Sequence, residues 1–369
     1  MGLLTILVFL GVMVLITTER VHRTAAALVG AAVLMLVKVF SFDEALEYVD
    51  FNTIGVLVGM MLFVAVLKRS GMFEYVAIKS AKLVNADPWK MMIIFVIITA
   101  LLSSCLDNVT TVLLVGPMTI AISNLLEVNP VPYLLMQILA SNVGGTATLI
   151  GDPPNIMIGS ATGLTFLDFV KNTGGAVVLV LIVQIFMMKF LYKKSIMATE
   201  EAKSKVMALD EKKAITDPRL MKIGIGVIIY IIIGFLFHDK LGIQSSVIAL
   251  SAAAFMLIIK GKHVEFLIED VEWSTILFFI SLFIIVGGMQ KTGVITAMSE
   301  ALIGLTEGHE LLTILVILWA SALISSILDN IPFVATMIPL ILAMKAQGMD
   351  VELLWWALSL GACLGGNGT

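Results

Sequence analysis

Two aspartates lie in the middle of long apolar segments, where an ionised side chain is costly. Asp107 falls within the apolar stretch 91–126 and Asp329 within 311–344, and each is followed by an asparagine. A charge at membrane depth costs at least about 2.5–3.5 kcal/mol, so such residues face the protein interior and are candidates for binding a cation or a proton. Asp is also a favoured N-cap residue, so each could instead cap the following helix. We expect cation or proton binding, and the two roles are compatible.

A second group of polar residues interrupts the apolar segment 131–166. Between residues 141 and 155 the sequence places two adjacent glycines, several hydroxyl residues and a Pro-Pro pair, which together break a helix. A helix broken inside a membrane offers bare carbonyls to a cation and a positive helix end to an anion. The stretch 365–369, rich in Gly with Asn and Thr, is its partner. We expect binding loops here, although a simple kinked helix is the alternative.

These aspartates and loops supply all the candidate binding residues. The candidates for substrate or ion binding are Asp107, Asn108, Thr110, Asn142, Gly144, Gly145, Thr146, Asp152, Asn155, Asp329, Asn330, Gly366, Asn367 and Thr369. Any bound Na⁺ is expected at Asp107, Asn108, Asp329 and Asn330. The predicted core holds no Lys or Arg, so an anionic substrate would depend on helix ends, hydroxyls and a bound cation.

Composition indicates that membrane helices position these residues. Apolar residues make up 59% of the 369 and charged residues 14%, with a mean hydropathy of +1.05. Soluble domains are about 45–50% apolar and about 25% charged. Apolar runs long enough to cross roughly 30 Å of hydrocarbon occupy 3–18, 24–40, 53–67, 173–192, 223–237 and 245–259. We therefore predict an all-α polytopic membrane protein whose surroundings are the lipid bilayer.

The sequence repeats itself at an offset of 222 residues. Thr53 falls on Thr275, and the stretches 103–104 and 106–108 fall on 325–326 and 328–330. Matched Gly, Asp, Asn and Pro residues without gaps are not explained by shared hydrophobicity, so two structural repeats are expected. We expect each to hold a discontinuous helix and a re-entrant hairpin, at 91–126 in the first; two full spans are the alternative for 91–126.

Charge indicates that the second repeat is inverted relative to the first. Residues 68–90 carry five Lys or Arg, whereas the equivalent stretch 290–312 carries one. Cytoplasmic loops are enriched in Lys and Arg, so the same element faces opposite sides of the membrane in the two halves. Inverted-topology repeats are typical of secondary transporters.

The repeat also predicts the division of the chain. Residues 1–192 form a first transmembrane repeat, 193–222 a solvated cytoplasmic linker with eight Lys or Arg, and 223–369 a second repeat. The second repeat is expected to be incomplete at its C-terminus, because its equivalents of residue 149 onward are missing.

The motifs resemble a known family. The matching stretches are LDNVTT at 106–111, 142–155 with its GDPPN ending, LDNIPF at 328–333, and GACLGGNGT at 361–369. With them the chain resembles the P-permease (pink-eyed dilution type) branch of the ArsB/NhaD ion transporter superfamily, which has a citrate transporter-like domain. The resemblance implies hairpins and broken helices that meet at a central site. In related dicarboxylate carriers a Ser-Asn-Thr motif at each hairpin tip helps bind sodium, and the extra negative charge of Asp here weighs against a sodium-plus-dicarboxylate mechanism.

We expect a secondary active ion transporter of the arsenite permease/NhaD type in the cell membrane, not an enzyme. It would move an inorganic ion or small anion by alternating access coupled to H⁺ or Na⁺. A Na⁺/H⁺ antiporter, a Na⁺-coupled carboxylate symporter and a passive channel are alternatives, and an intramembrane aspartyl protease is a remote one because its Gly-X-Gly-Asp signature is missing. No nucleic acid partner or organic cofactor is implied, and the oligomeric state is open, with a homodimer among the options.

Overall fold

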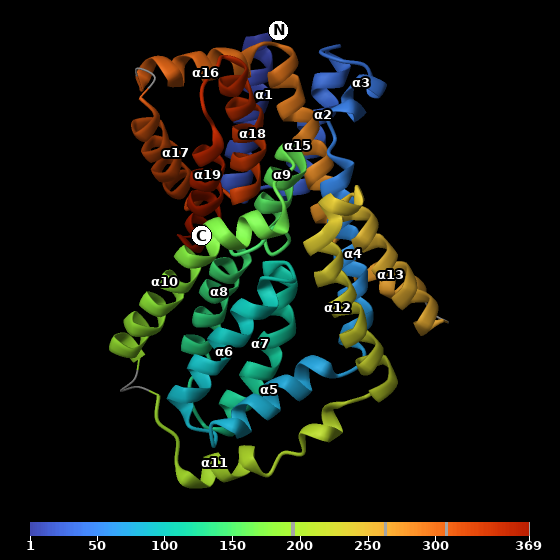
Figure 1. The fold of residues 1–369 in the computed structure, drawn as a ribbon, viewed down its shortest axis with the longest axis vertical. Helices are drawn as coiled ribbons and strands as arrows, with labels where there is room; N and C mark the ends of the chain where they lie inside the picture. Colours follow the sequence, from blue (N-terminus) through green and yellow to red (C-terminus); the bar gives the residue numbers. More distant parts are fainter. Residues whose placement is uncertain (193–195, 262–263, 307–308, 369) are drawn as a thin grey trace. The chain divides into compact units, whose positions relative to one another are not determined.

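A computed structural model describes residues 1–192, 196–261, 264–306 and 309–368, which fold into helices joined by short connections, with no strand among them (Figure 1). The all-α class is confirmed. The α-helices are α1 (Gly2–Thr17), α2 (Arg23–Leu36), α3 (Phe42–Glu47), α4 (Phe51–Lys68), α5 (Met72–Leu83), α6 (Pro88–Ser103), α7 (Asn108–Leu125), α8 (Val131–Gly145), α9 (Pro153–Thr162), α10 (Phe166–Tyr192), α11 (Glu200–Met207), α12 (Pro218–Leu241), α13 (Ser245–Lys260), α14 (Val264–Glu269), α15 (Trp273–Lys291), α16 (Val294–Leu305), α17 (Glu310–Ser325), α18 (Asn330–Ala346) and α19 (Glu352–Gly365). Two short 3-10 helices are η1 (Glu211–Ala214) and η2 (Gly366–Gly368).

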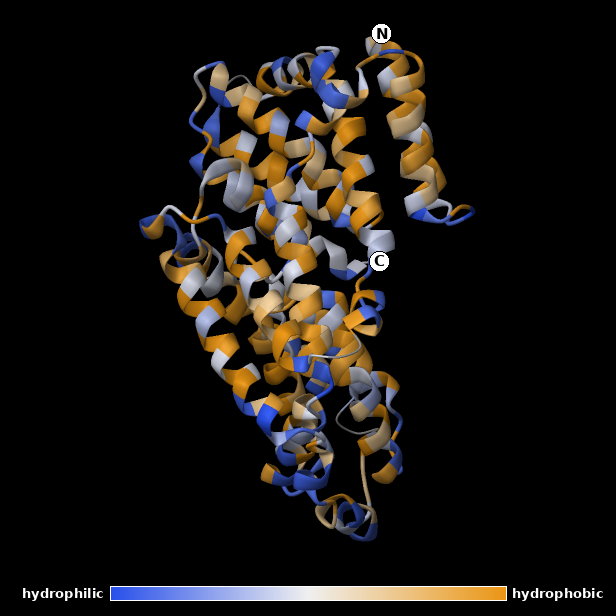
Figure 2. Ribbon diagram, turned by 90° about the vertical axis from the view of Figure 1, so that its right-hand side faces the viewer, coloured by the Kyte–Doolittle hydropathy of each residue, from blue (hydrophilic) through white to orange (hydrophobic). Residues whose placement is uncertain are grey.

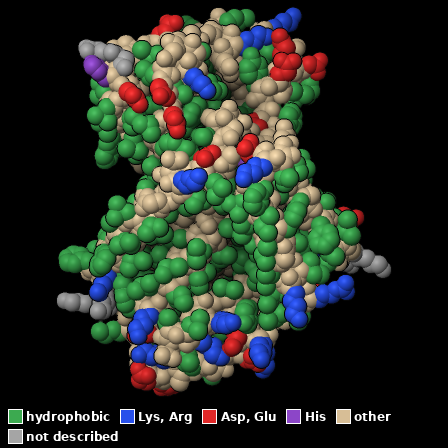
Figure 3. Space-filling model, in the orientation of Figure 1, with side chains coloured by type: hydrophobic (Ala, Val, Ile, Leu, Met, Phe, Trp, Pro, Cys, Tyr) green, Lys and Arg blue, Asp and Glu red, His purple; other side chains and the backbone are tan. Residues whose placement is uncertain are grey.

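Several helices have the length and composition of membrane spans. Among the described residues, α4, α7, α10, α12 and α15 are long and apolar enough to cross a bilayer, and shorter apolar helices accompany them. Figure 2 shows apolar residues along most helices, and Figure 3 shows hydrophobic side chains over much of the visible outer surface. Broad outward-facing apolar surface is typical of proteins surrounded by lipid, so this is a multi-pass membrane protein.

Helix boundaries recur along the chain. Helices α2 to α7 begin 222 residues before α13 to α18, as in Arg23 and Ser245, or Asn108 and Asn330. The offset shortens to 221 for the last pair, because α8 begins at Val131 and α19 at Glu352. The seven helices α2–α8 therefore return as α13–α19, while the inversion of the second set stays a prediction.

The chain divides into two compact units, and each draws helices from both halves of the sequence. The first unit comprises residues 1–57, 153–164 and 272–369, and the second comprises 58–152 and 165–271. The first unit thus combines α1 and α2 with the later helices α15–α19 and with α9. The second combines α5–α8 with α10–α14. The predicted division into 1–192, 193–222 and 223–369 stays a prediction about sequence repeats.

Each unit is built around a helical hairpin packed on a third helix. In the second unit α6 and α7 pack against α8, and α5 packs on α7; in the first unit α17 and α18 pack against α19, and α16 packs on α18. The core of the second unit contains large buried side chains, among them Met91, Met92, Tyr133 and Met136. The same packing scheme therefore positions both hairpins.

The linker between α10 and α12 is largely exposed along its described part, but α11 is docked on α5 and α7 of the same unit instead of moving as a free connection. Ala202 and Val206 of α11 are fully buried, with Val206 in the core beside α5 and α7. Lys82 of α5 forms an ion pair with Glu211 at 2.6 Å, and its hydrogen bond lowers the pKa of Glu211. Apolar burial, which sequence reading cannot see in so charged a segment, explains the docking.

Docking of the linker predicts different effects for two adjacent substitutions. Val206→Asp buries a charge without a partner, whereas Met207 is 38% exposed and tolerates Asp. Limited proteolysis of the detergent-solubilised protein should therefore cleave the linker of Val206→Asp much faster than that of the wild type or Met207→Asp. Equal cleavage of the two variants would contradict the docking.

Candidate functional site

The tip of the first hairpin, residues 104–107, ends in a buried carboxylate. Asp107 is 8% exposed. It is the N-cap of α7, and its two oxygens accept hydrogen bonds from the backbone N–H of Thr110 at 2.8 Å and from the Thr110 hydroxyl. Among the described residues, no Lys, Arg or His forms an ion pair with it. The predicted cap is present, and the carboxylate is held by hydrogen bonds rather than by an ion pair with any residue that the structure describes.

The predicted break in the helix facing this tip is also present. Helix α8 ends at Gly145, and the chain runs through residues 146–152 before α9 begins at Pro153. The Thr148 hydroxyl donates to the carbonyl of Ser104 and accepts from the backbone N–H of Gly151 at 3.1 Å. The Thr146 hydroxyl donates to the Asn142 carbonyl at 2.8 Å. These bonds hold the loop against the hairpin tip.

The side-chain amide of Asn108 lies among backbone carbonyl oxygens between the tip and the broken helix. Its amide nitrogen faces the carbonyls of Ser141 at 2.9 Å and Gly151 at 3.2 Å, and the Ser103 hydroxyl at 2.7 Å. Carbonyl and hydroxyl oxygens are the ligands that hard cations prefer. Rotation of the amide would present its oxygen to the same space and add another cation ligand.

Close helix contact supports both hairpins. A Cβ on Gly144 would collide with the backbone oxygen of Ala100, and a Cβ on Gly365 would lie 2.6 Å from that of Ala322. The Ser103 hydroxyl donates to the Ser141 carbonyl at 2.7 Å, and the equivalent Ser325 hydroxyl donates to the Ala362 carbonyl at 2.7 Å. Glycine thus allows each hairpin to approach its broken helix, and serine ties the two together.

The tip of the second hairpin, residues 326–329, neutralises its aspartate differently. Asp329 precedes α18 but makes no capping hydrogen bond with its side chain. The residue three positions on is Pro332, which has neither the N–H nor the hydroxyl that Thr110 provides. Asp329 instead forms an ion pair with Arg23 at 2.9 Å. The expectation that no Lys or Arg lies at the predicted binding residues is therefore wrong for Arg23, which pairs with Asp329 at a partly exposed position.

Arg23 is held by several contacts within the first unit. It starts α2, and its second terminal nitrogen donates to the Thr275 hydroxyl at 3.2 Å. Its guanidinium lies 5.4 Å from the centre of the Phe278 ring, a distance at which the ring attracts a cation. Asp329 and α15 therefore fix the guanidinium together.

The remaining candidates divide between the units. The second unit holds Asp107, Asn108, Thr110, Asn142, Gly144, Gly145, Thr146 and Asp152, and the first unit holds Asn155, Asp329, Asn330, Gly366 and Asn367. Asp152 is buried. Asn155 accepts from the Ser359 hydroxyl at 2.7 Å, joining α9 to α19. Thr369 lies outside the described residues.

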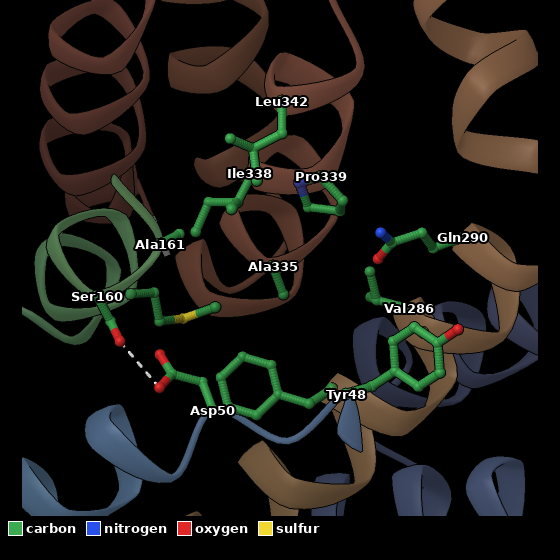
Figure 4. A pocket seen from close by; sticks show the side chains of 13 residues that line it. Tyr48, Asp50, Ser160, Ala161, Val286, Gln290, Ala335, Ile338, Pro339 and Leu342 are labelled. Atoms are coloured by element: carbon green, nitrogen blue, oxygen red, sulfur yellow. Dashed lines mark hydrogen bonds between the residues drawn. The ribbon is translucent and has the colours of Figure 1, made fainter. Parts of the chain in front are cut away.

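A cavity of about 260 Å³ in the first unit contains another carboxylate that the sequence reading missed. Figure 4 shows Asp50 at its edge with the Ser160 hydroxyl, and Gln290, Tyr48 and Pro339 around the rest. Asp50 accepts bonds from Ser160 and from the start of α4, including Thr53. Its match with Glu272 at the 222-residue offset was the available signal. These bonds join Asp50 to the first turn of α4 and to Ser160 of α9.

Comparison with known proteins places the chain in a family. The family model described as citrate transporter (CitMHS) matches residues 13–361. The chain belongs to the citrate transporter family. An uncharacterized transporter of Mycobacterium tuberculosis is 41% identical to this chain over 374 residues, which cover 100% of this chain and 87% of that protein.

Two further relatives support the same family assignment. The 46 kDa membrane protein of Mycobacterium leprae is 38% identical over 375 residues, which cover all of this chain and 87% of that protein. The P protein of Homo sapiens is 32% identical over 444 residues, covering 97% of this chain and 53% of the P protein. The resemblance to the P-permease branch is therefore confirmed, and the chain is a transporter by family.

The glycine contact at the first hairpin predicts a stability effect. Gly144→Ala should lower the free energy of unfolding by about 1–3 kcal/mol, because overpacking a close contact forces backbone shifts. Thermal unfolding in detergent measures the effect. Gly175→Ala in α10, where no atom lies within 4 Å of the added Cβ, is the matched control. Similar unfolding temperatures for the two variants would contradict the close contact.

Proposed function

We propose that this protein is a secondary active ion transporter of the arsenite permease/NhaD type. It moves an inorganic ion or small anion by alternating access, coupled to H⁺ or Na⁺. The observation that carries the proposal is the buried Asp107 carboxylate, which lies between two apolar helices and makes no ion pair with the described residues. A charge in that setting needs a mobile cation or proton to neutralise it.

The surroundings of Asp107 support cation binding. Asn108 follows it directly and lies against the Ser141 and Gly151 carbonyls, with the Ser103 hydroxyl beside them. A monovalent cation bound here would draw on these oxygens, and the nearby carboxylate would compensate its charge. Because the break between α8 and α9 supplies the Gly151 carbonyl, cation binding and the position of the broken helix would be coupled.

Na⁺-coupled carboxylate symport is a second candidate. The match to the citrate transporter family over residues 13–361 favours it. In this reading the cation at the first tip lowers the cost of bringing a carboxylate into an apolar site. Na⁺/H⁺ antiport would move Na⁺ and H⁺ without an anion, so the transported species distinguishes it from carboxylate symport.

Location and orientation complete the proposal. We place the protein in the cell membrane with residues 193–222 in the cytoplasm and the two repeats inverted. The excess of Lys and Arg in this linker and in 68–90 supports that orientation. The lipid bilayer is the proposed surrounding partner, and a homodimer is the proposed assembly.

Proteoliposomes carrying the full chain test the proposal. A Na⁺ or H⁺ gradient should drive uphill movement of one cargo from a panel of Na⁺, arsenite and citrate, read by a pH-sensitive dye or radiolabel. No uphill movement of any cargo by either gradient would contradict secondary active ion transport. Downhill flux alone would indicate a channel.

Asp107→Asn should abolish gradient-driven transport, because Asn can cap α7 but cannot balance a cation. Asp107→Glu should retain part of the rate. Asp87→Asn is the matched control, since Asp87 caps α6 through the Lys90 N–H at 2.9 Å at the opposite end of the same hairpin. Full coupled transport by Asp107→Asn would contradict the assigned role.

A further inference from the structure

The two hairpin tips carry the same Asp-Asn pair but balance its charge in different ways. Asp107 accepts hydrogen bonds from Thr110 within its own helix. Asp329 has no such bonds from α18 and forms an ion pair with Arg23. Within the described part of the chain, one tip therefore has a carboxylate with no ion-pair partner, and the other has an ion pair.

Two sequence differences at matched positions produce this asymmetry. At the 222-residue offset Thr110 corresponds to Pro332, which removes the capping donors from the second tip. Arg23, the first residue of α2, corresponds to Ser245, the first residue of α13. Asp329, which lacks the cap, thus pairs with the guanidinium of Arg23. The residue that matches Arg23 in the other repeat is Ser245, which carries no charge.

The guanidinium is held by a carboxylate, a hydroxyl group and an aromatic ring. Its terminal nitrogens contact the Asp329 carboxylate at 2.9 Å and the Thr275 hydroxyl at 3.2 Å, and the Phe278 ring faces its carbon. An adjacent cavity of about 490 Å³ is lined by Glu19, His22, Arg23 and Asp329, among others. Small ions from solution can therefore reach the ion pair.

We propose that Arg23 is a built-in substitute for a transported cation at the second tip. The protein then binds one coupling cation per cycle, at the Asp107 tip, while Asp329 stays neutralised by the guanidinium. Arg23 is a positioning residue that acts through Asp329. This inference rests on the proposed cation-coupled transport. It adds the number of coupling cations bound per cycle and explains that number by the ion pair at Asp329.

Chemical rescue of Arg23→Ala tests the proposal in proteoliposomes. Removing one partner of a partly buried ion pair should reduce the transport rate on the order of tenfold or more. Guanidinium chloride should restore much of the rate, because the free ion can occupy the vacated place beside Asp329. Arg69→Ala is the matched control: Arg69 pairs with Asp270 at the same 2.9 Å on the surface, and its loss should be mild and insensitive to guanidinium.

The dependence of the transport rate on the concentration of the coupling cation gives a second readout. For the wild type this dependence should have a Hill slope near one. For Arg23→Ala the slope should be steeper, because a second cation is then needed at Asp329. The double variant Arg23→Gln/Asp329→Asn, which removes both charges, should keep a slope near one and show no rescue. An unchanged slope in folded Arg23→Ala, or no rescue by guanidinium, overturns the proposal.

The double variant decides the question if Arg23→Ala does not fold. Retained transport with a slope near one supports the substitution of a cation by Arg23, whereas loss of cation dependence in the folded double variant overturns it. Failure of the proposed function looks different, because the wild type itself would then show no gradient-driven transport.

Discussion

A carboxylate placed between two apolar helices must be neutralised, and this requirement organises both hairpins. Asp107 is buried from water and Asp329 is partly exposed, so burial requires hydrogen bonds, a fixed counter-ion or a mobile cation most strongly at Asp107. Asp107 receives hydrogen bonds from the first turn of α7. Asp329 receives a guanidinium. Family membership makes the chain a transporter, and in our account this difference determines where the mobile cation binds.

The scaffold around these tips repeats more faithfully than their electrostatics. Ser103 and Ser325 bind carbonyls of α8 and α19, and Gly144 and Gly365 allow those helices to approach the hairpins. A duplicated chain preserves such contacts because every close-packed helix pair depends on them. The charges at the tips are less constrained by packing. Asp329 can therefore be paired with the fixed guanidinium of Arg23, while Asp107 in our account binds a mobile cation.

Much of the local structure could be predicted from sequence. The cap at Asp107, the break between Gly145 and Pro153, and the recurrence of helix boundaries follow from local residue preferences and from a visible repeat. The one-residue shortening before α19 was not predicted, because the matching stretch was too short to show it.

Contacts between distant residues could not be predicted in this way. Arg23 and Asp329 are 306 residues apart, and Arg23 lies in a short charged stretch that looks like an ordinary cytoplasmic loop. The linker likewise looks solvated because of its charges, although Ala202 and Val206 bury their side chains. Only Pro332 in place of Thr110 signalled in the sequence that the second aspartate needed another partner.

Cation-dependent stabilisation of the purified full chain tests the central claim without knowledge of the cargo. The unfolding temperature of the wild type, Asp107→Asn and Arg23→Gln/Asp329→Asn would be followed across a NaCl series, with choline chloride as the control, and across a pH series. Our account predicts that the stabilisation by Na⁺ or H⁺ disappears in Asp107→Asn and persists in the double variant. Stabilisation that survives in Asp107→Asn and disappears in the double variant would contradict it.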